Sequence, residues 1–201
     1  MSKQSAQIQA RDMAVEQLRK CDDISARLGR CGLTMAGDGT VGFRLFGVDA
    51  VFNTQDYSMT TADGGKPIRI GDEILMLHYL LCDVGSERSG EFITFRDFVG
   101  GQFYWQPFLS RSIKPLVSKI GNDLDLLKKN LAKFDYTEVE CGDFAADIHA
   151  MGDVYVRLIY RLGDEEFEPR ADVLFDSSIK RIFVAEDAAV IAGRICIGLL
   201  F

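Results

Sequence analysis

The chain has 201 residues, of which 47% are hydrophobic and 26% charged, a balance typical of a globular protein that buries a core. Its formal net charge of −7 and its lack of clustered Lys and Arg argue against nucleic-acid binding, because phosphate contacts need concentrated positive charge. The polar N-terminus and the short apolar runs argue against a signal peptide and a membrane span. We therefore expect a cytoplasmic protein.

The cysteines are spread along the chain: Cys21, Cys31, Cys82, Cys141 and Cys196. None forms the close pair that structural zinc and iron–sulfur sites use, in which two thiolates on one turn meet one metal. With only two histidines present, we predict no metal site and no evident cofactor. A site assembled only in three dimensions stays open as an alternative.

Apolar residues at helical spacing predict an N-terminal helix over about residues 5–28, which could be peripheral to the rest of the domain. Two short strands follow at 40–46 and 48–52, both rich in β-branched and aromatic residues. Residues 74–82 are apolar on every face and predict a central buried helix.

The middle of the chain continues this mixture. Residues 91–96 read as a strand and residues 99–101 as a loop. Helical spacing returns over 107–120, where Pro115 should kink the helix or split it in two, since proline removes a backbone hydrogen bond. Asn122 is suited to cap the helix that follows.

Alternating apolar residues in the C-terminal third predict two paired strands, at 144–150 and 154–160. A three-residue turn, 151–153, brings both apolar sets to the same side of the sheet. That register places Asp147 opposite Arg157 on the polar face.

The same register places His149 opposite Tyr155. A third strand at about 170–175 and a closing helix at 186–199 complete the chain. Because helices cluster in the middle and strands pair in sequence order, we predict one α+β domain over residues 1–201 rather than a doubly wound sheet.

The strongest candidate for ligand binding is a stretch that combines a cation, a glycine pair and adjacent aromatic rings: Arg96, Gly100, Gly101, Phe103, Tyr104 and Trp105. Glycines let a backbone approach a ligand closely, aromatic rings stack on flat molecules, and arginine binds carboxylates or phosphates. The alternative is a strand-to-helix turn whose aromatic residues anchor the core.

His78 lies within the apolar helix, where a desolvated imidazole could serve as a general base or a metal ligand. Alternatively it is a core histidine bonded to a buried carbonyl or acid. The cross-strand cluster around Asp147 is equally explained by an ion pair on a solvated sheet face. The Asp-Ser-Ser sequence at 176–178 reads as a cap or turn, because no base or nucleophile elbow accompanies it.

Several stretches together resemble an uncharacterised domain-of-unknown-function family of anaerobic bacteria and archaea: residues 73–81, 90–97, 100–104, 163–167 and 174–179. The resemblance spans about residues 70–192. It implies that members occur alone or joined to a small iron–sulfur module, in organisms that use iron–sulfur and corrinoid chemistry. This chain lacks the cysteine cluster of the fused form, and the family provides no catalytic residue to carry over.

Two functions follow as alternatives. The first is a non-enzymatic accessory module that binds a protein partner or a small-molecule ligand through a surface lined by residues 103–105. The second is an enzyme for a small anionic or planar substrate, with His78 or His149 as base and Arg96 as anion binder. The enzyme requires a histidine that opens onto a deep pocket shared with an arginine.

Overall fold

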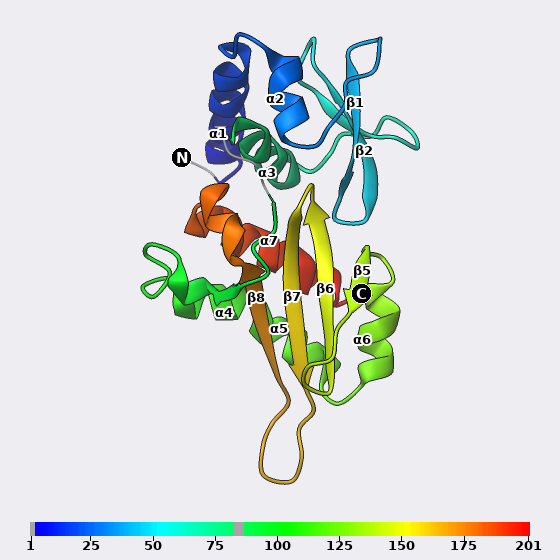
Figure 1. The fold of residues 1–201 in the computed structure, drawn as a ribbon. Helices are drawn as coiled ribbons and strands as arrows, with labels where there is room; N and C mark the ends of the chain where they lie inside the picture. The colour runs from blue at the N-terminus through cyan, green and yellow to red at the C-terminus, as the bar shows by residue number, and fades with distance from the viewer. Residues whose placement is uncertain (1–2, 83–86) are drawn as a thin grey trace.

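A computed structural model describes residues 3–82 and 87–201 and confirms the α+β class (Figure 1). Within these residues the strands form one antiparallel sheet of eight strands, in the order β3-β2-β1-β6-β7-β8-β4, with β5 paired to β6. Helices α1 and α3 pack together beside the N-terminal strands, while α5 packs on β8 and α7 packs on α5. Helices α5 and α7 thus cover one face of the C-terminal strands (Figure 1).

The helices are α1 (Lys3–Arg19), α2 (Ile24–Arg30), α3 (Ile70–Leu81), α4 (Trp105–Arg111), α5 (Ile113–Ile120), α6 (Leu124–Leu131) and α7 (Ala185–Gly198), with short 3-10 helices η1 (Phe95–Asp97) and η2 (Ser177–Arg181). The strands are β1 (Thr40–Leu45), β2 (Val48–Asn53), β3 (Met59–Thr61), β4 (Phe92–Thr94), β5 (Tyr136–Glu138), β6 (Phe144–Met151), β7 (Val154–Arg161) and β8 (Arg170–Asp176).

The single N-terminal helix predicted over 5–28 is wrong, because the chain breaks between α1 and α2. Asp23 lies in an extended conformation and its carboxylate accepts the backbone N–H of Ala26 at 2.9 Å. Aspartate competes for the backbone at such positions and so caps a new helix instead of continuing the old one. Helix α1 buries Val15 and Leu18 and packs against α3.

The strands predicted at 40–46 and 48–52 are confirmed as the hairpin β1 and β2. The predicted buried helix is also confirmed, although α3 begins at Ile70 and therefore includes Asp72 and Glu73 in its first turn. No residue of α3 is exposed. The short strands β3 and β5 were not predicted, because three residues are too few to show an alternating pattern.

Pro115 does accompany a split in the helical segment, but the break lies at Ser112, where α4 ends and α5 begins. Pro115 therefore falls in the first turn of α5, where a missing N–H costs no helical hydrogen bond. The predicted cap at Asn122 is wrong. Asp123 caps α6 by accepting the N–H of Leu126 at 2.8 Å.

The predicted pairing of β6 and β7 is confirmed, with Asp147 opposite Arg157. The turn differs by one residue, because Met151 already pairs with Val154 and leaves a two-residue turn. Gly152 adopts a φ of +48° there, as tight hairpin turns require. An irregularity in the register between His149 and Met151 absorbs the extra residue, as a bulge does.

The N-terminal and C-terminal parts of the sheet meet in a narrow joint, since β1 and β6 share one residue pair, Leu45 and Met151. Ion pairs cross between the parts from α3 and β1: Asp72 with Arg194 at 3.0 Å, His78 with Asp187 at 2.9 Å, and Arg44 with Asp135 at 2.8 Å. One hydrophobic core nevertheless includes residues of both parts. None of the described helices is long and apolar enough to span a membrane.

Candidate functional site

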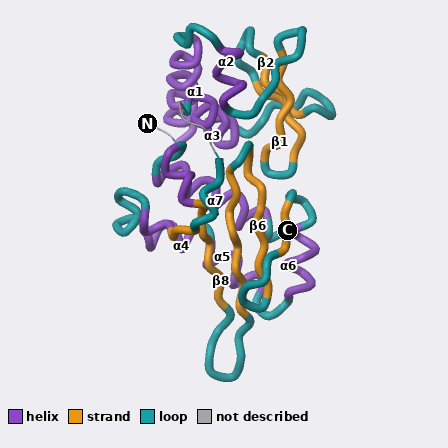
Figure 2. The backbone as a smooth tube through the Cα atoms, in the orientation of Figure 1, coloured by secondary structure: helices purple, strands orange, loops and turns teal. Residues whose placement is uncertain are grey.

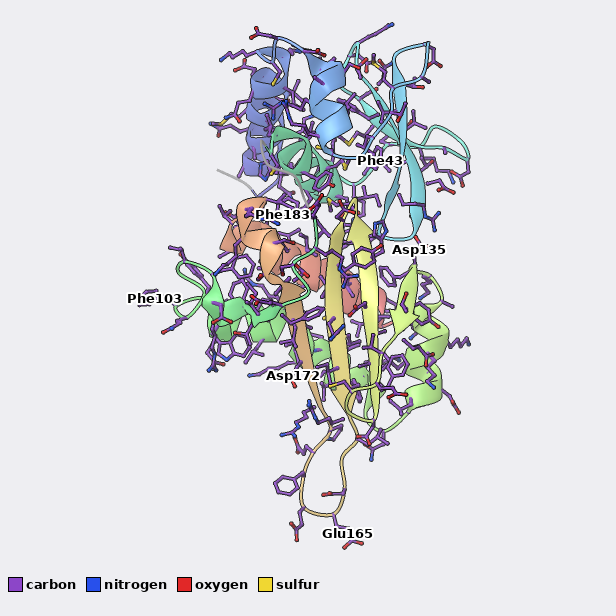
Figure 3. The ribbon with its side chains drawn as sticks, viewed as in Figure 1. Phe43, Phe103, Asp135, Glu165, Asp172 and Phe183 are labelled. Carbon is purple, nitrogen blue, oxygen red and sulfur yellow. The ribbon has the colours of Figure 1, made fainter. Side chains whose placement is uncertain are left out.

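The segment from Val99 to Tyr104, here called the 99–104 loop, projects from the body of the protein beside α4 (Figure 2). Val99 is 99% exposed, Phe103 90% and Tyr104 64%. Figure 3 shows Phe103 directed away from the fold. Isolated exposed apolar residues are ordinary, but three on one projecting loop form a patch of the kind used in recognition.

Backbone geometry accounts for the glycine pair of this loop. Gly100 has a φ of +80°, and the N–H of Phe103 donates to its carbonyl at 3.1 Å. At Gly101 a Cβ atom would collide with the carbonyl oxygen of Phe95. Glycine is thus favoured at position 100 by the positive φ and at position 101 by close approach of the chain to itself. The N–H of Gly101 donates to the carbonyl of Phe98 at 2.9 Å.

An aromatic stack anchors the loop to the core. Trp105 stacks on Phe108 with ring centroids 5.4 Å apart, and Phe108 stacks on Phe95 at 4.2 Å. Arg96 lies over the Trp105 ring at 4.4 Å, an arrangement that occupies this ring with a cation from its own chain. The structure thus separates the predicted aromatic trio, since Trp105 packs against the core while Phe103 and Tyr104 face solvent.

The base of the loop carries more positive than negative charge. Arg96 is exposed, and the ammonium of Lys180 lies 3.5 Å from the carbonyl oxygen of Asp97. Asp97 accepts the backbone N–H and the hydroxyl of Thr94 at 2.7 and 2.9 Å, and these bonds lower the pKa of its carboxyl. The apolar tip is therefore flanked mainly by cations.

His78 lies apart from this loop, on α3. Its Nδ1 is 2.9 Å from a carboxylate oxygen of Asp187, on α7, and 34% of the His78 side chain is exposed. The hydrogen bond to Asp187 raises the pKa of the imidazole, against the opposing effect of burial. Asp187 thus stabilises the imidazolium form of His78, and the geometry suits an ion pair between helices better than a neutral base.

His149 is also engaged. Its Nε2 lies 2.8 Å from the carbonyl oxygen of Gly152, and because a carbonyl only accepts, the ring must donate from this nitrogen. The same imidazole lies against Tyr155, with centroids 5.0 Å apart. His149 therefore supports the β6–β7 turn.

The cross-strand cluster is larger than the predicted ion pair, and its carboxylate, Asp147, is buried rather than on a solvated face. Asp147 accepts two hydrogen bonds from Arg157, at 2.7 and 3.0 Å, and a third from Arg88 at 3.0 Å. Burial opposes ionisation of Asp147, but these bonds outweigh it and lower the pKa of the carboxyl. Arg157 also lies 3.8 Å above the ring of Phe92, and Arg88 lies 4.4 Å above Tyr155.

The Asp-Ser-Ser turn is confirmed as a cap. Asp176 ends β8, is 2% exposed, and accepts the N–H of Ser178 at 3.0 Å. It also accepts the hydroxyl of Ser89 at 2.8 Å. Sequence reasoning missed Ser89, because the two residues are 87 positions apart and no local pattern links them.

The described ranges contain no group of three His, Cys, Asp or Glu side chains positioned to hold a metal ion. Cys196 is buried and burial raises the pKa of its thiol to about 12, whereas Cys141 is exposed. One pocket lies along α1 and another beside η2. Neither is lined by His78, His149 or Arg96.

Comparison with known proteins identifies the family. The family model described as "Domain of unknown function (DUF3786)" matches residues 23–197, so the chain belongs to this family of uncharacterised domains. The match extends the resemblance seen over 70–192 toward both ends of the chain. No curated protein and no solved structure gives a significant match.

Proposed function

We propose that this protein is a non-enzymatic accessory module that binds a protein partner through the 99–104 loop. The carrying observation is the exposure of Val99 and Phe103, at 99% and 90%, on a loop that hydrogen bonds and an aromatic stack hold in place. A rigid apolar tip loses little conformational entropy on binding, which favours its use as an anchor.

The partner we propose is a protein with an apolar pocket bordered by carboxylates. The pocket would receive Phe103 and Val99, and the carboxylates would face Arg96 and Lys180 at the base of the loop. Charges at the rim of an interface mainly set orientation and association rate. We therefore expect binding that weakens moderately, but persists, as the salt concentration rises.

We also propose that this module acts in anaerobic metabolism. The family resemblance implies organisms that use iron–sulfur and corrinoid chemistry, and a small module without a metal cluster of its own would serve there by binding another protein. The enzymatic alternative, with a histidine base and Arg96 as anion binder, has less support. Its two histidines contact Asp187 and Gly152, and neither lines a described pocket.

Site-specific crosslinking tests the proposal. A photoreactive phenylalanine analogue at position 103, expressed in cells of the source organism, should crosslink to one defined protein. The same analogue at position 167 is the matched control, because Phe167 is also a loop phenylalanine and is 69% exposed. Identical crosslinks from both positions, or none from position 103, would contradict the proposal.

Binding of the identified partner, purified, then provides the quantitative test. Phe103→Ser should raise Kd by roughly thirtyfold, as expected when an interface anchor worth about 2 kcal/mol is lost. Phe167→Ser should leave Kd unchanged. Both positions are exposed, so circular dichroism should show an unaltered fold in each variant. An unchanged Kd for Phe103→Ser would remove the loop from the interface.

A further inference from the structure

A pocket of about 390 Å³ lies beside the end of β8, between η2 and the chain that leads into β4. Its lining consists of serines and charged side chains: Glu87, Arg88, Ser89, Ser177, Ser178 and Arg181. None of these residues belongs to the 99–104 loop. A ligand of this pocket would therefore bind apart from the proposed protein-binding loop.

Asp176 organises the serine side of this pocket from beneath. One carboxylate oxygen accepts the N–H and hydroxyl of Ser89, at 2.9 and 2.8 Å, and the N–H of Ser178 at 3.0 Å. The other accepts the N–H of Gly90 at 2.9 Å. Burial opposes ionisation, but these donors outweigh it and hold the pKa of Asp176 well below its usual value. The carboxylate therefore only accepts.

The negative charge of Asp176 determines which serine hydroxyl donates in each hydrogen bond. A serine hydroxyl has a single proton, and Ser89 donates its proton to Asp176. The oxygens of Ser89 and Ser177 are 2.9 Å apart, so Ser177 must be the donor of that bond. The proton of Ser177 is then directed inward, and its oxygen lines the pocket as a hydrogen-bond acceptor.

Two guanidinium groups provide hydrogen-bond donors to the pocket, whereas Ser177 provides an acceptor. Arg88 is held by its bond to Asp147 at 3.0 Å and by the ring of Tyr155. Arg181 donates from Nη2 to the carbonyl oxygen of Glu87 at 2.9 Å, and no carboxylate within the described ranges pairs with it. Guanidinium groups only donate, and they match oxyanions in geometry.

We propose that this pocket binds a small oxyanion, a carboxylate or phosphate, that carries a hydroxyl group beside its charged group. The charged oxygens would accept from Arg181 and Arg88, and the ligand hydroxyl would donate to Ser177. An anion without a donor satisfies only the arginines and leaves the Ser177 oxygen without a ligand partner. The arrangement thus discriminates by hydrogen-bond polarity as well as by charge.

Two matched pairs of probes test this site: acetate against glycolate, and ethyl phosphate against 2-hydroxyethyl phosphate. Calorimetry and amide chemical-shift mapping on the full chain should show the hydroxylated member of one pair binding about fivefold more tightly than its partner, as one neutral hydrogen bond provides. Whichever pair binds more tightly identifies the charged group as carboxylate or phosphate.

Variants then assign the roles. Ser177→Ala should abolish the difference within the pair, whereas Ser177→Thr, which keeps the hydroxyl, should retain it. Arg181→Gln should weaken both members about tenfold, as loss of a charge-assisted hydrogen bond implies. Arg170→Gln is the matched control, because Arg170 is an exposed arginine at the other end of β8 and does not line the pocket.

Three results would overturn the site. The first is an absence of shifts at the amides of residues 89, 90, 177 and 178 with every probe in the millimolar range. The second is equal affinity within both pairs. The third is a loss in Arg170→Gln as large as that in Arg181→Gln, which would indicate a general electrostatic effect. None of these results bears on the docking proposal, which rests on the 99–104 loop.

Discussion

Single buried carboxylates form ion pairs that join residues far apart in the sequence of this protein. Asp72 pairs with Arg194, Asp187 with His78, and Asp147 with two arginines. All three carboxylates are buried, and a buried charge is tolerated only when it is paired and hydrogen-bonded. Because each of these acids already has a cationic partner, we assign them a structural role rather than a catalytic one.

The pair of His78 and Asp187 predicts a pH-dependent stability. The folded pKa of His78 is raised, so the stabilisation is fully present below the ordinary histidine pKa of about 6.5 and is lost as pH rises through the folded pKa. The free energy of unfolding of the native protein, minus that of Asp187→Asn, should be larger at about pH 5.5 than at about pH 8.5.

The expected change is on the order of 0.5–1 kcal/mol, because 34% of the His78 side chain is exposed and solvent screens the pair. Urea denaturation of both proteins at the two pH values measures it. The lost hydrogen bond adds an offset that does not vary with pH. A difference that is constant across the range would show that His78 is not charged in this pair.

At the scale of elements, the 99–104 loop depends on backbone contact rather than on side-chain packing at its tip. Its conformation requires the carbonyl of Phe95 to pass where a side chain at position 101 would lie. The aromatic stack of Trp105, Phe108 and Phe95 then joins the loop to α4 and η1. The tip stays exposed, because its support lies at its base.

Gly101→Ala should therefore destabilise the protein by about 1–3 kcal/mol, the usual cost of forcing an extra methyl group into a filled space. Gly64→Ala is the control, since open space surrounds that position and the change should remain within about 0.5 kcal/mol. Chemical denaturation followed by the fluorescence of Trp105 measures both. Equal stability of the two variants would mean that the loop can adopt another conformation.

At the scale of the whole molecule, the narrow joint between β1 and β6 raises the question of whether the chain folds as one unit. The tip of the β6–β7 hairpin packs on α3, where the Tyr79 hydroxyl accepts the N–H of Asp153 at 3.4 Å. A Cβ atom at Gly152 would collide with this hydroxyl. The contact between Gly152 and Tyr79, which joins the two parts of the sheet, thus leaves no room for a larger side chain.

Gly152→Ala should lower stability by about 2–3 kcal/mol, from positive-φ strain and from overlap with Tyr79. Gly65→Ala is matched to it, since Gly65 has a φ of +63° but open surroundings, and should cost only about 1 kcal/mol. For a single domain, Trp105 fluorescence and hydrogen exchange in α1 and α3 should report one coincident unfolding transition. Two separate transitions would show that the chain forms two domains.

Local patterns in the sequence were sufficient to predict the class of fold and much of its detail. Alternation in β6 and β7 predicted the pairing of Asp147 with Arg157, a run that is apolar on every face predicted α3, and helical spacing predicted α7. These patterns are informative because burial of one face imposes its own period on a strand or a helix. The break at Asp23 and the cap at Asp123 were missed because several neighbouring residues could serve as caps, and sequence alone does not rank them.

Only the tertiary structure decided which of the adjacent aromatics would be buried. Phe103, Tyr104 and Trp105 are equivalent in hydrophobic pattern, yet Trp105 stacks on Phe108 while Phe103 is exposed, because α4 begins at Trp105 and Phe103 lies in the loop before it. Likewise, Ser89 meets Asp176 across 87 positions. Such contacts depend on how whole elements pack, and no local periodicity records that packing.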